Sequence, residues 1–396
     1  MENAKELLLE GQGTFCDIIK VALYGEDEQV FDKLDFEQDA VFMEPMLFGY
    51  CTKKDPRPLK QQILFGTLNP TDRPKQLTVY TNKNGVVYLP SYAYLETQAP
   101  NATLELDYNA EKDSLTLYQA GQSIPFTKKP ITYLQNLPQV ELSNCLDIYS
   151  EALLYAWPRV EEASITQLLE KEGVDIAAFQ PAIEQAFQLL EQYFPEEWEK
   201  YALTTRRIVL FSHPQLRNFA TREAHGTIYL NVNENSNVTF FLEELIHQCS
   251  HTVFNAMTCE TQDFFLVDYN QTVGSFLNNK YYRTLYSALH GIYTTGQIVD
   301  LFLKLIKAQP NLDTRTLHEL QGRIAINKTR HNIGLEKVKA SQIFTPKGQA
   351  IFQFYYEQLD KNIRANPTFF EYDMSTHPVV FNYEKFKADN PISLVG

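Results

Sequence analysis

Apolar and polar residues alternate through much of the chain between about residues 45 and 138, which predicts β-strands. Two pairs of alternating runs each enclose a short polar turn: 76–80 and 85–89 around Asn82-Lys-Asn-Gly, and 102–108 and 114–118 around Asn109-Ala-Glu-Lys-Asp. Alternating runs that enclose such a turn are typical of β-hairpins, so we expect two hairpins. We therefore predict a mostly antiparallel, β-rich N-terminal module at residues 1–140, which begins with a helix-leaning stretch.

After about Leu142 the apolar residues recur at i, i+3 and i+4, the spacing of an amphipathic helix. Helices are expected at 163–170, 183–194, 239–257, 280–307 and 345–359, and short strands at 208–211 and 226–232. Asn237 is expected to cap the helix at 239–257, and Pro346 to lie in the first turn of the last helix. The predicted fold class is α+β, with a helical second domain at residues 141–396.

The expected helix at 239–257 contains His247-Gln-Cys-Ser-His251, in which two histidines lie four residues apart. This spacing places both imidazoles on one helical face, one turn apart, where they can share a metal ion. Hydrolases of the H-E-x-x-H type carry a glutamate after the first histidine, and that glutamate deprotonates the metal-bound water. Gln248 stands at this position, and its amide has no useful basicity. The motif therefore predicts a metal site and favours redox iron over hydrolytic zinc.

Other residues near the motif have two interpretations each. Glu244 lies on the face of His247, but the seven residues from Glu244 to His251 span about 10 Å of helix, so we predict that Glu244 orients His247 and does not bind the metal. His290 lies among apolar neighbours, and a packed core histidine is the simpler interpretation. Arg283 lies two turns before His290 and is expected on the same helical face, either as a clamp for a carboxylate or as a surface arginine.

The composition narrows the class of partner. The net charge is −14, from 35 basic and 49 acidic residues, which argues against nucleic acid and suits a cationic peptide better. Five scattered cysteines without a Cys-x-x-Cys pair fit a reducing cytosol. The N-terminus has no signal-peptide pattern, and no run approaches the ~18 apolar residues of a membrane span. We therefore expect a cytoplasmic protein that does not bind membranes.

Four blocks of the second half resemble the HExxH-motif peptide-modifying family. Members of that family are iron(II)- and 2-oxoglutarate-dependent peptide β-hydroxylases, encoded near ribosomally synthesised peptide natural products. The chain has counterparts of the family's glycine-led strand, histidine motif, leucine-histidine-glycine helix and threonine-x-x-glycine helix start: Gly226-Thr-Ile-Tyr-Leu, His247-Gln-Cys-Ser-His, Leu289-His-Gly-Ile-Tyr and Phe344-Thr-Pro-Lys-Gly. Their order and spacing agree across about residues 200–360. Residues 1–140 show no resemblance, and Gln248 departs from the family motif.

The resemblance implies a dioxygenase that hydroxylates a side-chain β-carbon of a precursor peptide, with iron(II), 2-oxoglutarate and O2. Three histidines would then be the iron ligands: His247, His251 and His290. Gln248 and Glu244 would complete the catalytic surroundings, and Arg283 would bind the far carboxylate of 2-oxoglutarate. The rival arginines are Arg206, Arg207, Arg323 and Arg330.

The order strand, loop, helix matches zincins, in which an edge strand near the metal pairs with an extended peptide. We therefore expect a zincin-like catalytic domain in which the strand at 226–232 is a short edge strand that binds the substrate. The β-rich module is expected to help recognise the peptide, or else to be purely structural. Two other functions remain open. One is a zinc peptidase-like enzyme in which Glu243 or Glu244 replaces the missing base, and the other is an inactive peptide-binding paralogue.

Overall fold

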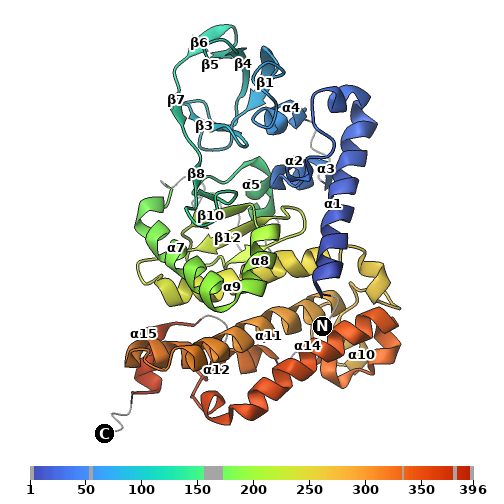
Figure 1. The fold of residues 1–396 in the computed structure, drawn as a ribbon, viewed down its shortest axis with the longest axis vertical. Coiled ribbons are helices and arrows are strands. Elements are labelled where there is room, and N and C mark those ends of the chain that lie inside the picture. The colour runs from blue at the N-terminus through green and yellow to red at the C-terminus, as the bar shows by residue number, and fades with distance from the viewer. Residues whose placement is uncertain (1–3, 53–56, 156–172, 332–333, 378–380, 393–396) are drawn as a thin grey trace. The chain divides into compact units, whose positions relative to one another are not determined.

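The computed structural model describes residues 4–52, 57–155, 173–331, 334–377 and 381–392. A β-rich N-terminal part precedes a helical C-terminal part, which confirms the predicted α+β class (Figure 1). The chain divides into two compact units. We call Met1–Gly11, Gln185–Tyr201 and Ser236–Gly396 the helical unit, and Gln12–Glu184 and Ala202–Asn235 the sheet unit. The domain boundary expected at residue 141 does not coincide with this division and stays a prediction. No described helix is long and apolar enough to cross a membrane.

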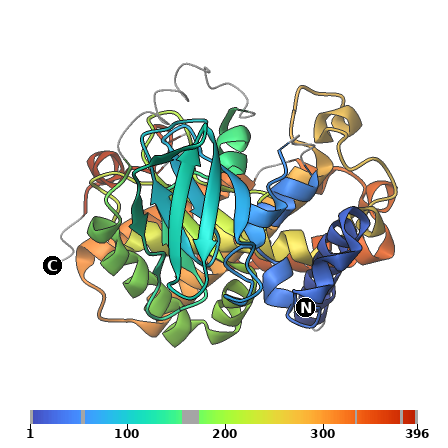
Figure 2. The ribbon, with the colours of Figure 1, turned by 90° about the horizontal axis from the view of Figure 1, so that it is seen from above.

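The strands of the sheet unit form three sheets. The first, seen face-on in Figure 2, has the order β1 (Gln76–Tyr80), β4 (Thr103–Asn109), β5 (Ser114–Gln119), β6 (Gln122–Ile124). The second has the order β2 (Val86–Leu89), β3 (Ala93–Glu96), β7 (Thr127–Lys129). The third has the order β11 (Phe219–Ala220), β12 (Thr227–Asn231), β10 (Arg207–Phe211), β9 (Glu141–Ser143), β8 (Thr132–Tyr133). In the third sheet β9, β10 and β12 are parallel, and β8 and β11 are antiparallel edge strands.

The helices before the first strand are α1 (Ala4–Glu26), the 3-10 helix η1 (Glu28–Asp32), α2 (Asp39–Phe42), α3 (Pro45–Thr52) and α4 (Lys60–Leu64). Those between β9 and β10 are α5 (Ile148–Tyr155), α7 (Ile176–Tyr193) and α8 (Pro195–Thr204). The rest of the chain carries α9 (Val238–Met257), η2 (Thr261–Phe264), α10 (Val273–Leu277), α11 (Leu285–Ala308), α12 (Thr314–His331), η3 (Leu335–Lys337), α13 (Ala340–Ile343), α14 (Pro346–Ala365), η4 (Pro367–Phe370) and α15 (Tyr383–Asp389). The helix expected at 163–170 lies outside the described residues.

One of the two predicted hairpins is present and the other is wrong. β4 and β5 pair antiparallel as expected. β1 and β2 do flank a turn at Asn82, but β1 pairs with β4 and β2 with β3, in different sheets. The side chain of Gln62, from α4, separates the two strands. Its amide donates to the carbonyls of Tyr80 and Tyr88 at 3.2 and 3.1 Å and accepts from the Tyr80 N–H at 2.8 Å. Backbone groups of Tyr80 and Tyr88 therefore form hydrogen bonds with the Gln62 side chain in place of bonds between β1 and β2.

The strand expected at 226–232 forms as β12, but it is not an edge strand. It lies between β10 and the two-residue β11. On the β11 side, the Thr227 N–H donates to Ala224 and the Asn231 N–H donates to the Asn218 side chain, and Tyr229 pairs with Phe219. Because this side is already hydrogen-bonded, the prediction that a peptide adds to β12 is wrong. The sequence did not reveal β11, since two residues carry no readable pattern.

The main helices of the helical unit begin where side-chain caps place them. Asn237 caps α9 by accepting the Phe240 N–H at 2.9 Å, as predicted. Thr345 caps α14 through the Gly348 N–H, and Pro346 is its first residue. α11 begins later than expected, at Leu285, because Thr284 caps it by accepting the Ser287 N–H at 3.1 Å. The expectation that Arg283 shares a helical face with His290 is therefore wrong, since Arg283 precedes the helix.

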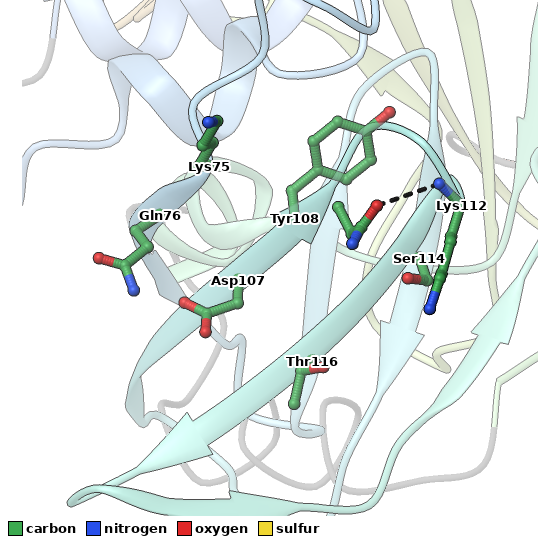
Figure 3. A pocket seen from close by; sticks show the side chains of 8 residues that line it. Lys75, Gln76, Asp107, Tyr108, Lys112, Ser114 and Thr116 are labelled. Carbon is green, nitrogen blue, oxygen red and sulfur yellow. Dashed lines mark hydrogen bonds between the residues drawn. The ribbon is translucent and has the colours of Figure 1, made fainter.

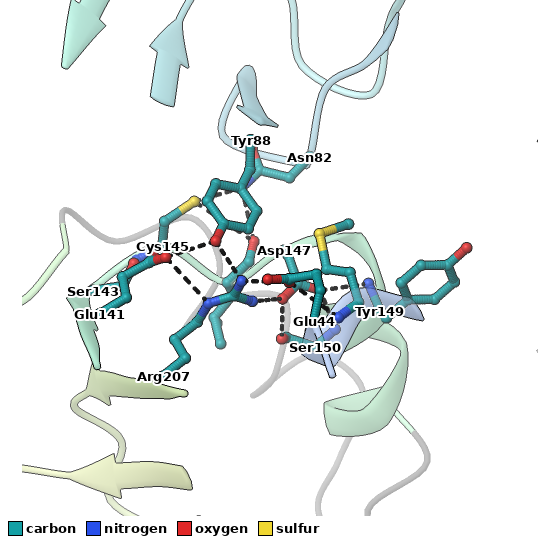
Figure 4. A network of polar contacts seen from close by, with 12 residues as sticks. Glu44, Asn82, Tyr88, Glu141, Ser143, Cys145, Asp147, Tyr149, Ser150 and Arg207 are labelled. Carbon is teal, nitrogen blue, oxygen red and sulfur yellow. Dashed lines mark hydrogen bonds and ion pairs between the residues drawn. The ribbon is translucent and has the colours of Figure 1, made fainter. Parts of the chain in front are cut away.

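A buried charge cluster occupies the interior of the sheet unit (Figure 4). The guanidinium of Arg207 contacts Glu44 at 2.7 Å, Asp147 at 3.2 Å and Glu141 at 3.5 Å, and it donates to the hydroxyl of Tyr88. The Tyr88 hydroxyl in turn donates to Glu141 at 2.6 Å. We call these five residues the Arg207 cluster. Burial raises the pKa of Glu44 above its ordinary 4.5, and Arg207 opposes that shift. The cluster connects β2 to β9 and β10 and to the segments before α3 and α5.

Candidate functional site

The helix α9 is buried along almost its whole length, with one accessible stripe. Between Phe241 and Met257 every residue is buried except Glu244, His247 and His251. These positions follow one another by three and four residues, so they lie on one helical face. A helix that is otherwise in the core thus partly exposes two imidazoles and a carboxylate. This pattern fits a site that small molecules reach.

His251 is the centre of a histidine group formed by α9 and α11, which pack against each other. Its Nδ1 lies 2.7 Å from Nε2 of His290, and its ring centroid lies 4.8 Å from that of His247. His290 is 9% exposed and stacks on Phe254 at 4.8 Å between centroids. Burial, with the neighbouring His290, His247 and Arg283, holds the pKa of His251 well below 6.5. A neutral imidazole is the form that binds a metal.

The side chain of Gln248 connects Glu244 to His247. It is 1% exposed, and its amide nitrogen lies 3.1 Å from Oε2 of Glu244 and 3.3 Å from Nδ1 of His247. The same carboxylate oxygen lies 3.8 Å from Nδ1 of His247. Glu244 therefore reaches His247 chiefly through Gln248, on the Nδ1 side of the ring. The Nε2 side faces away from this pair of residues.

The structure distinguishes among the candidate arginines for an anion clamp. Arg323 is buried and bonds to Glu243 at 2.5 Å and to Glu319 at 2.7 Å, while Arg207 is held in its cluster. Arg206 lies beside Arg207 at the start of β10, in the sheet unit, and the side chain of Arg330 lies outside the described part of the chain. Only Arg283 is shown to lie near the histidine group.

Arg283 is half-buried, and its field lowers the pKa of His251. No acidic side chain among the described residues pairs with its guanidinium. Its Nη1 lies over Gly291, where an added Cβ would be 2.9 Å away. The sequence prediction that Arg283 lies near His290 therefore holds for the guanidinium, although the helical geometry behind it was wrong.

Tyr286 and Asn255, which the sequence did not single out, add polar contacts between α9 and α11. The hydroxyl of Tyr286 donates to Asn255 at 3.0 Å and lies 3.1 Å from the hydroxyl of Thr258. The ring of Tyr286 is 5.6 Å from that of His290. Asn255 lies one turn after His251, so a search along the helical face at i+4 finds it. Tyr286 and Asn255 therefore lie at the end of the histidine group opposite to Glu244.

The sheet unit contains a shallow, open recess on the outer face of the first sheet (Figure 3). Gln76, Asp107 and Thr116 lie side by side across β1, β4 and β5, and two lysines flank them, Lys75 and Lys112. Its lining contains neither histidine nor cysteine. The expectation that this part of the chain recognises a peptide stays a prediction.

Among the described residues, no group of three or more histidine, cysteine, aspartate and glutamate side chains is already arranged around a common metal position. The three histidines meet as two pairs that share His251. No protein-family model matches the chain, and no curated protein matches it. The interpretation of the site therefore depends on the side chains themselves and on the resemblance of the four sequence blocks.

Proposed function

We propose that this chain is an iron(II)- and 2-oxoglutarate-dependent dioxygenase that hydroxylates a side-chain β-carbon of a ribosomally made peptide. One observation carries the proposal: a partly exposed histidine stripe on a buried helix meets His290 and lies near a half-buried arginine that has no acidic partner among the described residues. Histidines beside an arginine suit a metal that binds together with an anionic co-substrate. The zincin-like fold and the iron ligands are part of this proposal.

The histidine group has donor atoms that fit iron(II). Nδ1 of His251 and Nε2 of His290 lie 2.7 Å apart, so these two nitrogens already face one another. In this proposal His251 and His290 would hold the metal together with His247, which would contribute Nε2 because its Nδ1 faces Gln248 and Glu244.

The proposed chemistry makes modest demands on the protein. Iron(II) with 2-oxoglutarate and O2 supplies its own oxidant, so the chain need only provide ligands, open positions and substrate binding. Arg283 binds the far carboxylate of 2-oxoglutarate through its planar, bidentate guanidinium. Gln248 is the residue of the H-E-x-x-H base position, and it holds Glu244 and His247 in place without accepting a proton.

Arg283→Ala is expected to raise the 2-oxoglutarate requirement while iron stays bound. Removing a charge-assisted contact of this kind costs about 2 kcal/mol, or about 30-fold in affinity. Titration of the iron-loaded protein with 2-oxoglutarate measures the change, and Arg315→Ala is the control, because Arg315 is exposed and pairs with Glu384. If the two variants bind 2-oxoglutarate equally well, Arg283 is not the clamp.

The zinc peptidase is the main rival, and its candidate bases are already engaged. Glu243 is buried against Arg323, and Glu244 accepts a hydrogen bond from Gln248. Gln248→Glu supplies the missing carboxylate, but it places two carboxylates at hydrogen-bond distance, so they tend to share a proton. The double variant Glu244→Gln/Gln248→Glu removes this repulsion by exchanging the two side chains. It therefore tests general-base chemistry alone.

We expect neither Gln248→Glu nor the exchanged variant to cleave peptides, and we expect hydroxylation to change only modestly. Mass spectrometry of a candidate peptide, with each protein loaded separately with zinc and with iron plus 2-oxoglutarate, gives the answer. A general base contributes about 10²–10⁴-fold, so revived hydrolysis is easy to detect. Cleavage by the zinc-loaded exchanged variant would overturn the oxygenase proposal. A gain of one oxygen atom with the iron-loaded wild type would support it, and structural metal without turnover would indicate an inactive paralogue.

A further inference from the structure

We propose that Gly291 is a positioning residue for Arg283: its missing side chain leaves the space in which the guanidinium lies beside the histidine group. This inference rests on the proposed function for its ligand, a carboxylate anion, but the placement of the guanidinium can be tested without that function. It assigns a role to a glycine in the middle of a helix, where glycine is otherwise unfavourable.

The atoms around Gly291 indicate why this position is a glycine. A Cβ built there would lie 2.9 Å from Nη1 of Arg283, and no other atom of the described residues outside its own stretch of helix lies within 4 Å. Gly348 differs, because its Cβ would strike the Phe264 carbonyl at 2.0 Å, so it serves backbone packing. At Gly291 no backbone of another described segment approaches, and the side chain of Arg283 takes the space.

The backbone of Arg283 is held in place, so its side chain has few ways to adapt. The carbonyl of Arg283 accepts the Val273 N–H at 2.8 Å, and Thr284 caps α11. From this fixed point the side chain extends along the first turns of α11 to Gly291, the neighbour of His290. A methyl group at 291 would turn the end of this flexible side chain aside at little cost to the fold. The expected damage is therefore to anion binding and not to stability.

Gly296 provides a matched control on the same helix. A Cβ at Gly296 would meet Leu359 at 3.9 Å, which is an ordinary contact. Gly291→Ala and Gly296→Ala both replace a helical glycine by a better helix former, so neither should lower the melting temperature. They differ in whether the new methyl group meets the guanidinium.

The first measurement is ¹⁵N–¹H NMR of the arginine side chains in metal-free full-length protein. The Arg283 signal is identified by its absence in Arg283→Ala. We expect Gly291→Ala to shift this signal and Gly296→Ala to leave it in place. An unchanged Arg283 signal in Gly291→Ala would overturn the inference whatever the chain's function is.

The second measurement is binding of 2-oxoglutarate to the iron-loaded proteins. Gly291→Ala should weaken binding about tenfold, Gly296→Ala should not, and Gly291→Ala should have no further effect in the Arg283→Ala background. Normal affinity in Gly291→Ala, with wild-type binding present, would also overturn the positioning role. If the NMR signal shifts but the wild type does not bind 2-oxoglutarate, the placement of Arg283 by Gly291 is supported and the proposed co-substrate is wrong.

Discussion

In the His251→Ala variant, iron is expected to be lost together with hydroxylation of the peptide. His251 is the shared member of both histidine pairs, so its removal separates His247 from His290. Loss of a residue that merely orients a ligand weakens metal binding about 10–100-fold, and loss of a ligand should cost more. His247→Ala is expected to behave in the same way. Iron stoichiometry after gel filtration and the mass of the peptide product measure the two effects.

The control for His251→Ala is another histidine of the helical unit. His318 is buried in α12, where its ring packs against Phe386. His318→Ala should lower stability and leave the iron content unchanged. Full iron loading of His251→Ala would contradict the assignment of His251 as an iron ligand. Unchanged affinity in His290→Ala would return His290 to the role of a packed core residue.

Arg207→Met is expected to destabilise the protein by about 3–5 kcal/mol, because it leaves buried carboxylates without their cation. The Arg207 cluster has three carboxylates around one guanidinium, and all four side chains are at most 13% exposed. Urea unfolding followed by circular dichroism measures the change in the free energy of unfolding. Arg206→Met is the matched control, since no carboxylate is hydrogen-bonded to Arg206 among the described residues.

The pH dependence gives the Arg207 prediction a second test. Arg207 opposes the burial that raises the pKa of Glu44, so without Arg207 the pKa of Glu44 should rise further above its unfolded value. A carboxyl group with a raised folded pKa favours folding below its unfolded pKa and loses that contribution as the pH rises through the folded pKa. The deficit of Arg207→Met should therefore be largest at neutral pH and shrink toward pH 4. A deficit that is independent of pH, or a small one, would mean that the cluster contributes packing alone.

Local signals in the sequence predicted the parts of the fold that depend on neighbouring residues. The asparagine at 237 and the Thr345-Pro pair fix the starts of α9 and α14, and both were read correctly. The i,i+4 histidines do lie on one face. The start of α11 was misplaced because the apolar pattern continues before Thr284, although a threonine cap can be read there.

The errors concern partners that lie far apart in the sequence. The pattern around Asn82 predicts a hairpin, but the side chain of Gln62, some twenty residues earlier, bonds to the end of β1. The sequence predicts β12 as an edge strand, but the two residues 219–220 pair with it on that side. The Arg207 cluster joins residues as far apart as Glu44 and Arg207, which no periodicity can connect. The contact between Nη1 and Gly291 likewise depends on a side-chain path that the sequence does not encode locally.

The division of the chain bears on how it folds during synthesis. The helical unit contains Met1–Gly11 as well as Ser236–Gly396, and Gly11 lies so close to α9 that an added Cβ would meet the Ala256 carbonyl at 1.8 Å. During synthesis, the residues up to Gly11 can therefore reach their native contacts only after more than two hundred further residues have been made. Contacts this distant in sequence slow folding and prolong the exposure of apolar surface on the nascent chain. A fragment that begins at residue 141 would also lack this N-terminal piece, so the histidine helix is best studied in the full-length protein.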